Sequence, residues 1–320
     1  MRLVLVLVAL LAAIPASAVT IEWVYVGEPD NPPDTTNCSG CGSVSYGYYI
    51  SKYEVTNAQY AELLNAKAAS DPLGLYNTSM GSDATFGGIT RSGISGSYGY
   101  TVKAGFENKP VTYVSFYDSL RFANWLNNGQ GSTSTETGAY TLLGAATPSN
   151  GLTVTRNPGA LTFLPSDDEW YKAAYYDPAL PGYYDYPAGI DTPTTCATPS
   201  ATPNTANCQS AVDALTDVGS YTGSVSPNGT FDQGGNVAEW NETIVVGTLN
   251  PLLRFRRLWG GSWESTDDDL AGAFPGSTPP AAAKNSVGIR VASLVPEPDA
   301  GLLGITAVLG LAANRRRRAS

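Results

Sequence analysis

Three stretches of the chain combine a helix-starting signal with apolar residues at helical spacing. In a capping box, a Ser or Thr side chain bonds the backbone three residues on, and a polar side chain at that position bonds back. This pattern occurs at Thr56/Gln59, Ser115/Asp118 and Ser166/Glu169. The apolar residues that follow are Tyr60, Leu63 and Leu64; Leu120, Ala123 and one of Trp125 and Leu126; and Trp170, Ala173 and Ala174. The pattern predicts three helices that each bury one face.

The rest of the pattern favours short strands and long loops. The run YYISKYEV before the first helix is typical of a strand. Residues 70–105 are rich in glycine, and residues 183–210 are rich in Pro, Thr and Asn. Loops of this length in a compact domain are usually functional, or are stabilised by ions and disulfides. The pattern alone therefore predicts a loop-rich α+β domain.

The first 18 residues resemble a secretory signal peptide. Arg2 precedes an apolar run over residues 3–14, and Ala16-Ser17-Ala18 is typical of a cleavage site. We expect cleavage after Ala18. The alternative is that the run forms a short buried helix.

The last 26 residues, 295–320, also have a recognisable pattern. Pro296-Glu297-Pro298 is followed by an apolar run over residues 300–313 and by four arginines, 315–318. The apolar run is shorter than the ~20 residues of a comfortable membrane span, and the arginines should stay on the cytoplasmic side. This order is similar to a PEP-CTERM sorting tail, which implies handling by an exosortase-type sorting machinery. An ordinary membrane anchor is the alternative.

The charge and the histidine content exclude several classes of function. The chain has 28 acidic and 18 basic residues and a net charge of −10, so it offers no basic groove for nucleic acid. It contains no histidine. This excludes Ser-His-Asp and Cys-His catalysis, zinc bound through histidine, and iron sites with histidine ligands.

The four cysteines form two local pairs, Cys38/Cys41 and Cys196/Cys208. In an exported chain, such pairs favour disulfides. A bridge between Cys196 and Cys208 would stabilise its loop by about 3 kcal/mol on the loop-entropy model. The CSGC segment also has the spacing of a redox motif, so a redox or metal role and free thiols remain as alternatives.

Six segments in order resemble one known family. They are YISKYEVTNAQYAELLNA, PVTYVSFYDSLRFANWLN, TFLPSDDEWYKAAYY, GTFDQGGNVAEW, RRLWGGSW and VGIRVA. Together they are similar to the sulfatase-modifying-factor family, which includes formylglycine-generating enzymes. The resemblance implies one domain over residues 19–294, with a C-type-lectin-like α+β fold, little regular secondary structure and bound calcium.

The resemblance also implies a set of calcium ligands. Carried over residue by residue, these are the side chains of Asn236 and Glu239 and the backbone carbonyl of Val237, with Asn241 as a further candidate. A carboxylate combined with amide and backbone oxygens suits calcium, which takes ~6–8 oxygen ligands. The alternative is that Asn236 and Glu239 only cap turns. We assign no second calcium site, because residues 218–221 lack the family's acidic residue.

The chain departs from the family at the catalytic centre. Formylglycine-generating oxidases bind copper(I) through two cysteines shortly after a Gly-Gly-Ser element, since soft thiolates select copper(I). Here Gly260-Gly261-Ser262 is followed by WESTDDDL, and no cysteine occurs after Cys208. We therefore expect no copper, unless one of the cysteine pairs forms a different copper site. The histidine-dependent iron branch of the family is excluded as well.

Two other groups of side chains are candidates for binding. Asp267, Asp268 and Asp269 with Glu264 could hold a metal or a cationic ligand, although such a run is more often a solvated loop. The 19 tyrosines include Tyr175-Tyr176 and the run Tyr183-Tyr184-Asp185-Tyr186. Tyrosine loops can bind sugars or proteins, but tyrosine also fills loop-rich cores.

These observations leave three hypotheses for the function. The first is a non-catalytic, calcium-stabilised module that is exported to the cell surface or the extracellular matrix, where it binds a polysaccharide or protein. The second is a formylglycine-generating-type oxidoreductase that acts on a protein cysteine. The third is a purely structural surface protein.

Overall fold

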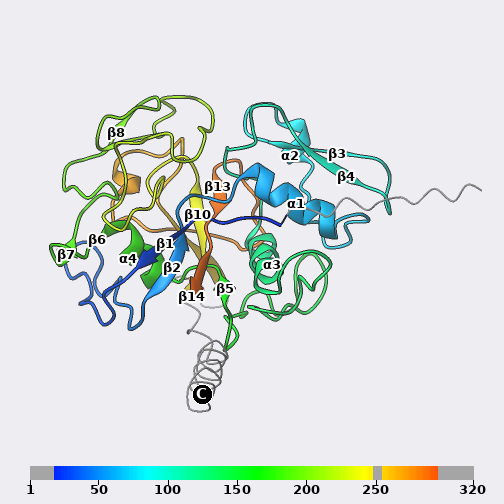
Figure 1. Cartoon of the computed structure of the whole chain (residues 1–320), viewed down its shortest axis with the longest axis horizontal. Helices are drawn as coiled ribbons and strands as arrows, with labels where there is room; N and C mark the ends of the chain where they lie inside the picture. The colour runs from blue at the N-terminus through cyan, green and yellow to red at the C-terminus, as the bar shows by residue number, and fades with distance from the viewer. Residues whose placement is uncertain (1–17, 248–253, 295–320) are drawn as a thin grey trace, which may run out of the picture.

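The computed structural model describes residues 18–247 and 254–294. These residues form an α+β body in which two four-stranded sheets lie near the centre, with helices and hairpins around them (Figure 1). The fold class expected from the sequence is confirmed. Apart from Ala18, the signal peptide and the sorting tail lie outside the described residues. Within the described part, no helix is long and apolar enough to cross a membrane.

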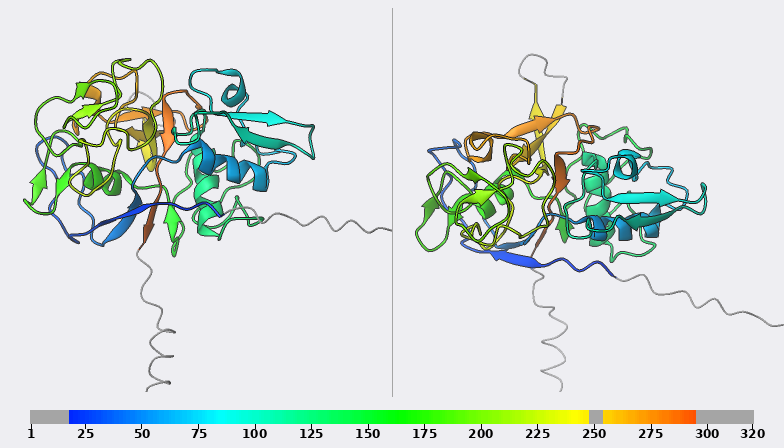
Figure 2. Two further views of the ribbon diagram at one scale, coloured as in Figure 1. Left: turned by 45° about the horizontal axis from the view of Figure 1, so that its top comes forward. Right: turned by 90° about the horizontal axis from the view of Figure 1, so that it is seen from above.

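Two sheets contain four strands each. The first has the order β1-β2-β14-β5, and the second has the order β12-β11-β10-β13. Their bounds are β1 Trp23–Val26, β2 Tyr48–Ser51, β14 Ala292–Leu294, β5 Thr162–Phe163, β12 Gly276–Thr278, β11 Arg254–Trp259, β10 Ala238–Val246 and β13 Val287–Ile289. The right-hand view of Figure 2 shows the outer ends of β10 and β11 projecting from the body.

Three small pairs of strands complete the described sheets. They are β3 (Ile89–Ser92) with β4 (Gly99–Val102), β6 (Tyr176–Asp177) with β7 (Gly182–Tyr183), and β8 (Thr195–Cys196) with β9 (Thr205–Ala206). The Cys196–Cys208 disulfide links β8 to the residues just after β9. A bridge therefore constrains one of the long loops recognised in the sequence.

The three predicted helices are confirmed with their capping boxes. They are α1 (Asn57–Lys67), α3 (Phe116–Asn127) and α4 (Asp167–Tyr175). In each, the cap side chain accepts a backbone hydrogen bond and the third residue bonds back, which supplies partners for amides that would otherwise lack them. The predicted apolar faces are buried, and Trp125 rather than Leu126 completes that of α3. A single-turn helix, α2 (Ser79–Ser82), and a 3-10 turn, Asp268–Leu270, were not predicted.

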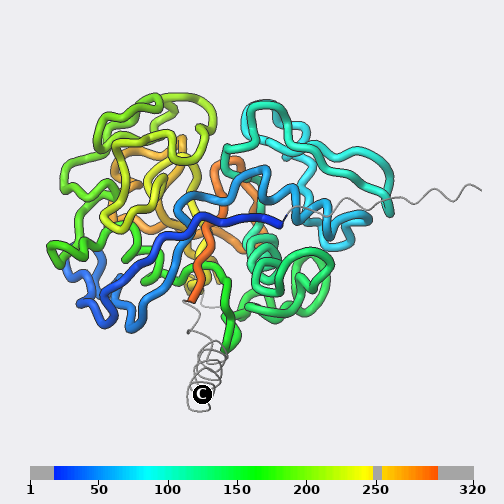
Figure 3. The backbone as a smooth tube through the Cα atoms, viewed as in Figure 1, coloured from blue at the N-terminus to red at the C-terminus, as the bar shows by residue number. Residues whose placement is uncertain are grey.

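The first and last described strands lie in one sheet. β14 pairs antiparallel with β2, where Ser293 lies opposite Tyr49, and also with β5. In Figure 3 the blue N-terminal segment and the orange C-terminal segment cross near the centre of the view. The turn between β13 and β14 carries Arg290, which therefore lies between the two sheets.

A buried ion pair joins the segments that meet there. Arg290 donates to the carboxylate of Glu239 from Nη2 at 2.7 Å and from Nε at 2.8 Å, and both side chains are inaccessible to solvent. Arg290 also donates to the carbonyls of Ser51 and Phe231, each at 2.7 Å. Trp170 Nε1 donates to Glu239 at 2.6 Å. One pair of side chains thus connects β10, the β13–β14 turn, the end of β2, the loop before β10, and α4.

Replacing Arg290 with methionine should strongly destabilise the fold. Glu239 would then be buried without its guanidinium partner, and such a loss typically costs about 3–5 kcal/mol. Urea unfolding of the variant measures the effect. The matched control is Lys52→Met, which removes a surface pair with Glu22 at 3.5 Å and should cost less than about 1 kcal/mol. Similar losses in both variants would contradict a central role for Arg290.

Candidate functional site

The predicted calcium ligands lie at the start of β10 and just before it. Gly235 and Asn236 both have a positive φ, of 84° and 58°, so the backbone turns sharply just before β10. Asn236 Nδ2 donates to Glu54 Oε2 at 3.0 Å, and its Oδ1 accepts from the backbone N–H of Thr216 at 3.1 Å. The backbone N–H of Val237 donates to the other oxygen of Glu54 at 3.2 Å. The turn therefore directs Asn236 and Val237 toward Glu54.

Glu239 and Asn241 bond to other parts of the molecule. The carboxylate of Glu239 is held by Arg290 and Trp170. Asn241 Nδ2 donates to Asp167 at 3.2 Å, and its Oδ1 accepts from the backbone N–H of Thr243. A calcium ion at Glu239 would have to sit against the positive charge of Arg290. As this structure places them, the four residues do not fit one calcium ion.

One buried oxygen nearby does have the character of a cation ligand. Asn207 is 1% exposed, and its Oδ1 has no hydrogen-bond partner. The Nδ2 of the same side chain donates to Asn236 Oδ1 at 3.2 Å. An unpartnered buried oxygen is costly unless water or an ion satisfies it. However, residues 18–247 and 254–294 contain no group of three or more Asp, Glu, Cys or His side chains that could hold a metal.

Two further buried carboxylates surround this turn. Glu54 is 1% exposed, and burial, followed by the nearby Asp232 and Glu239, raises its pKa well above the usual range. Asp232 accepts from the backbone N–H of Gly219 at 2.5 Å. Burial raises the pKa of Asp232 to about 6, although this N–H and Arg290 oppose the shift. Glu54, Asp232 and Glu239 are therefore three buried acids close to one guanidinium group, that of Arg290.

A cleft of about 450 Å³ opens beside the Gly260-Gly261-Ser262 element. Its apolar surface comes from β10, β11 and β13, through Ala238, Leu258, Trp259 and Val287. Hydroxyl groups line much of the rest, from Ser262, Ser265, Ser277, Thr278 and Ser286. Glu264, Asp269 and Lys284 add charges of both signs, and the ring of Phe274 at the rim is 55% exposed. The cleft combines an exposed aromatic ring with many hydrogen-bonding groups.

The three consecutive aspartates do not converge on one point. Asp267 accepts from Gln209 Nε2 at 2.7 Å. Asp269 lines the cleft, but its carboxylate accepts from the backbone N–H and the hydroxyl of Thr266, each at 2.9 Å. The triplet therefore shapes the 3-10 turn, and only Asp269 of the three lines the cleft.

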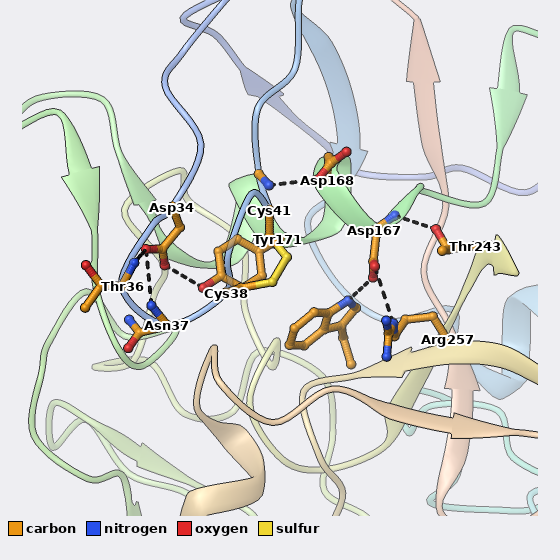
Figure 4. Close-up of a disulfide and its surroundings, with 12 residues drawn as sticks. Asp34, Thr36, Asn37, Cys38, Cys41, Asp167, Asp168, Tyr171, Thr243 and Arg257 are labelled. Carbon is orange, nitrogen blue, oxygen red and sulfur yellow. Dashed lines mark hydrogen bonds and ion pairs between the residues drawn. A yellow bond between two sulfur atoms is a disulfide. The ribbon is translucent and has the colours of Figure 1, made fainter. Parts of the chain in front are cut away.

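The cysteines lie outside this cleft. Cys38 and Cys41 are bonded to each other, and Figure 4 shows the bridge beside Tyr171, whose hydroxyl donates to Asp34 at 2.7 Å. The same view shows Asp167, which bonds to Thr243 and Arg257. Cys196 and Cys208 form the second bridge. Neither pair lines the cleft beside Gly261.

Several residues of these sites carried no sequence signal. Glu54 lies in a quoted segment, YISKYEVTN, but no local pattern distinguishes a buried glutamate from an exposed one. Phe274 and Lys284 lie in the loops before and after β12, which have no helical or strand periodicity. The usable signals are the Gly-Gly-Ser element and the acidic group after it, of which Glu264 and Asp269 line the cleft.

Asp232→Asn should change how stability depends on pH. The pKa of about 6 lies above the ordinary value near 4, so the folded state binds this proton more tightly than the unfolded state does. The resulting stabilisation is fully present below pH about 4 and is lost as the pH rises through about 6. The unfolding free energy of the variant relative to the wild type should therefore rise by about 2 kcal/mol between these values.

Urea unfolding at pH 4 and pH 7 measures this difference. Asp191→Asn, which changes an exposed carboxylate, is the matched control and should show a nearly constant difference from the wild type. An equally constant difference for Asp232→Asn would contradict the prediction.

Comparisons with known proteins agree with this architecture. Residues 38–295 match the family model of the sulfatase-modifying factor enzyme 1-like domain. No curated protein matches the sequence significantly. The structure is similar to that of CarF, with 20% identity and a TM-score of 0.51 over 86% of this chain and 99% of CarF. It is also similar to Treponema denticola variable protein 1, with 17% identity and a TM-score of 0.53 over 88% of this chain and 98% of that protein.

The two structural likenesses show a shared fold and do not by themselves carry an activity. The family model covers most of the chain, including the capping boxes of all three predicted helices, the Gly-Gly-Ser element and Arg290. The chain therefore belongs to the sulfatase-modifying factor enzyme 1-like domain family.

Proposed function

We propose that this chain is an exported, non-catalytic member of the family that binds a polysaccharide in the cleft beside Gly261. The observation that carries the proposal is the lining of this cleft, which contains five serine and threonine residues, charged residues of both signs and an exposed phenylalanine ring, but no cysteine. Hydroxyl and carboxylate groups can bond to sugar hydroxyls, and an aromatic ring at the rim can stack on a sugar face. A copper oxidase of this family would need two soft sulfur ligands there.

The location follows from the two ends of the chain. Residues 1–18 are expected to direct export, and residues 295–320 to be recognised by an exosortase-type machinery that delivers the domain to the cell surface or matrix. The membrane would then be contacted only through the tail. An intact mass beginning at Val19 in protein recovered from outside the cytoplasm tests the export. Protein retained in the cytoplasm with residues 1–18 attached would contradict it.

A glycan array followed by calorimetry on the purified protein tests the cleft. Phe274→Ala should weaken binding of a glycan found on the array about tenfold, a loss of about 1.4 kcal/mol, because the exposed ring is removed. Leu180→Ala is the matched control, since Leu180 is 73% exposed and does not line the cleft. Glycan binding that is insensitive to Phe274 would place the ligand elsewhere.

Experiments on the same purified protein also test the formylglycine-generating hypothesis and the purely structural hypothesis. Copper(I) titration and incubation with a cysteine-bearing sulfatase peptide test the formylglycine-generating reading. Stoichiometric copper and oxidation of the peptide would overturn the non-catalytic proposal. If array and pull-down experiments recover neither a glycan nor a protein, the purely structural role is favoured. Recovery of a protein alone would replace the polysaccharide as the ligand.

The proposal also includes a bound calcium ion, with Asn207 in place of Glu239 as a ligand. The unpartnered oxygen of Asn207 beside Asn236 supports a cation at this turn better than Glu239 does. We expect calcium and no copper in the purified protein, and a lower melting temperature after chelation that added calcium restores. Asn207→Leu should abolish this response, whereas Asn241→Leu should retain it. An identical melting temperature with and without chelator would contradict calcium binding.

A further inference from the structure

A second and larger cavity, of about 630 Å³, lies away from the cleft beside Gly261. Its walls come from residues 20–22 before β1, the segment that joins β2 to α1, the first turn of α1, and the loop 217–220. None of these residues lines the cleft. The cavity is therefore a separate candidate site with its own set of side chains.

Glu54 lies on the wall of this cavity, and no cationic side chain in the described part of the chain forms an ion pair with it. Its two oxygens accept from Asn236 Nδ2 at 3.0 Å and from the N–H of Val237 at 3.2 Å. Donors on both oxygens favour the ionised carboxylate. Within residues 18–247 and 254–294, however, no lysine or arginine forms an ion pair with Glu54, and the nearby Arg290 pairs with Glu239 instead. The hydrogen bonds thus favour a charge that burial disfavours, and a cation in the cavity would resolve this conflict.

The rest of the cavity provides for the remainder of such a ligand. Ser220 lines the cavity, and its hydroxyl oxygen is buried without a hydrogen-bond partner, a cost that an N–H donor would remove. Asp217 lies on the wall with a side chain that is 55% exposed, and its pairing with Lys109 at 3.8 Å is long. Ile21, Val55 and Ala58 add apolar surface.

We propose that this cavity binds an ammonium or guanidinium group carried on a short aliphatic chain, with Glu54 as its counter-ion. The cationic head would pair with Glu54 and donate to Ser220, while the methylene groups pack on the apolar wall. A bare metal ion fits less well, because the cavity is far larger than an ion. A free polyamine and a lysine or arginine side chain of another protein share this chemistry.

Calorimetry of the full exported chain with cadaverine tests the proposal. We expect a dissociation constant of about 1 mM or below for cadaverine and no detectable binding of 1,5-pentanediol, which has the same length without charge. Glu54→Gln should weaken cadaverine binding at least about tenfold. The control Asp191→Asn removes an exposed carboxylate outside the cavity and should bind as the wild type does.

A second pair of variants keeps the test decisive if the buried position 54 does not tolerate glutamine. Asp217→Asn and Ser220→Ala should each weaken binding about threefold while the melting temperature changes little. Comparable binding of Nα-acetyl-lysine amide would identify a protein side chain as a sufficient source of the cation, and binding of cadaverine alone would indicate a free polyamine. Equal binding of cadaverine and pentanediol, or no binding of either at about 10 mM, would overturn the proposal.

Discussion

A glutamate and an arginine that are fully removed from water hold the centre of this molecule together. Glu239 and Arg290 are 51 residues apart in the chain, and their pairing fixes β10 against the turn between β13 and β14. The remaining donors of Arg290 reach the backbone of β2 and of the loop before β10. A buried charge that loses its partner is far more costly than a lost surface pair, so these segments are constrained to meet in one arrangement.

That constraint decides what the turn before β10 can do. The carboxylate beside Trp240 looked like a calcium ligand in the sequence, but its oxygens are used by Arg290 and by the indole of Trp170. Asn236 instead faces Glu54 and Asn207. The polar groups of the turn therefore divide into a set around Arg290 that holds the fold and a second set around Glu54, in which Asn207 Oδ1 lacks a hydrogen-bond partner.

The two cavities illustrate how a fixed core allows variable surfaces. Both border β10 or the residues that contact it, yet one is lined by residues around the Gly-Gly-Ser element and the other by residues around Glu54. Their linings come largely from loops, which can change without disturbing the buried pair. This accounts for a chain that retains the family's architecture while the cleft beside Gly261 lacks the soft ligands of its oxidases.

The sequence alone determined the elements whose bonds close within a few residues. The capping boxes at Thr56, Ser115 and Ser166 could be recognised because both partners lie three residues apart, and six ordered segments were enough to identify the family. Only the tertiary structure decided which acid meets which partner. Glu54, Glu239 and Arg290 come from distant segments, and burial and long-range pairing depend on how those segments pack, which no local pattern records.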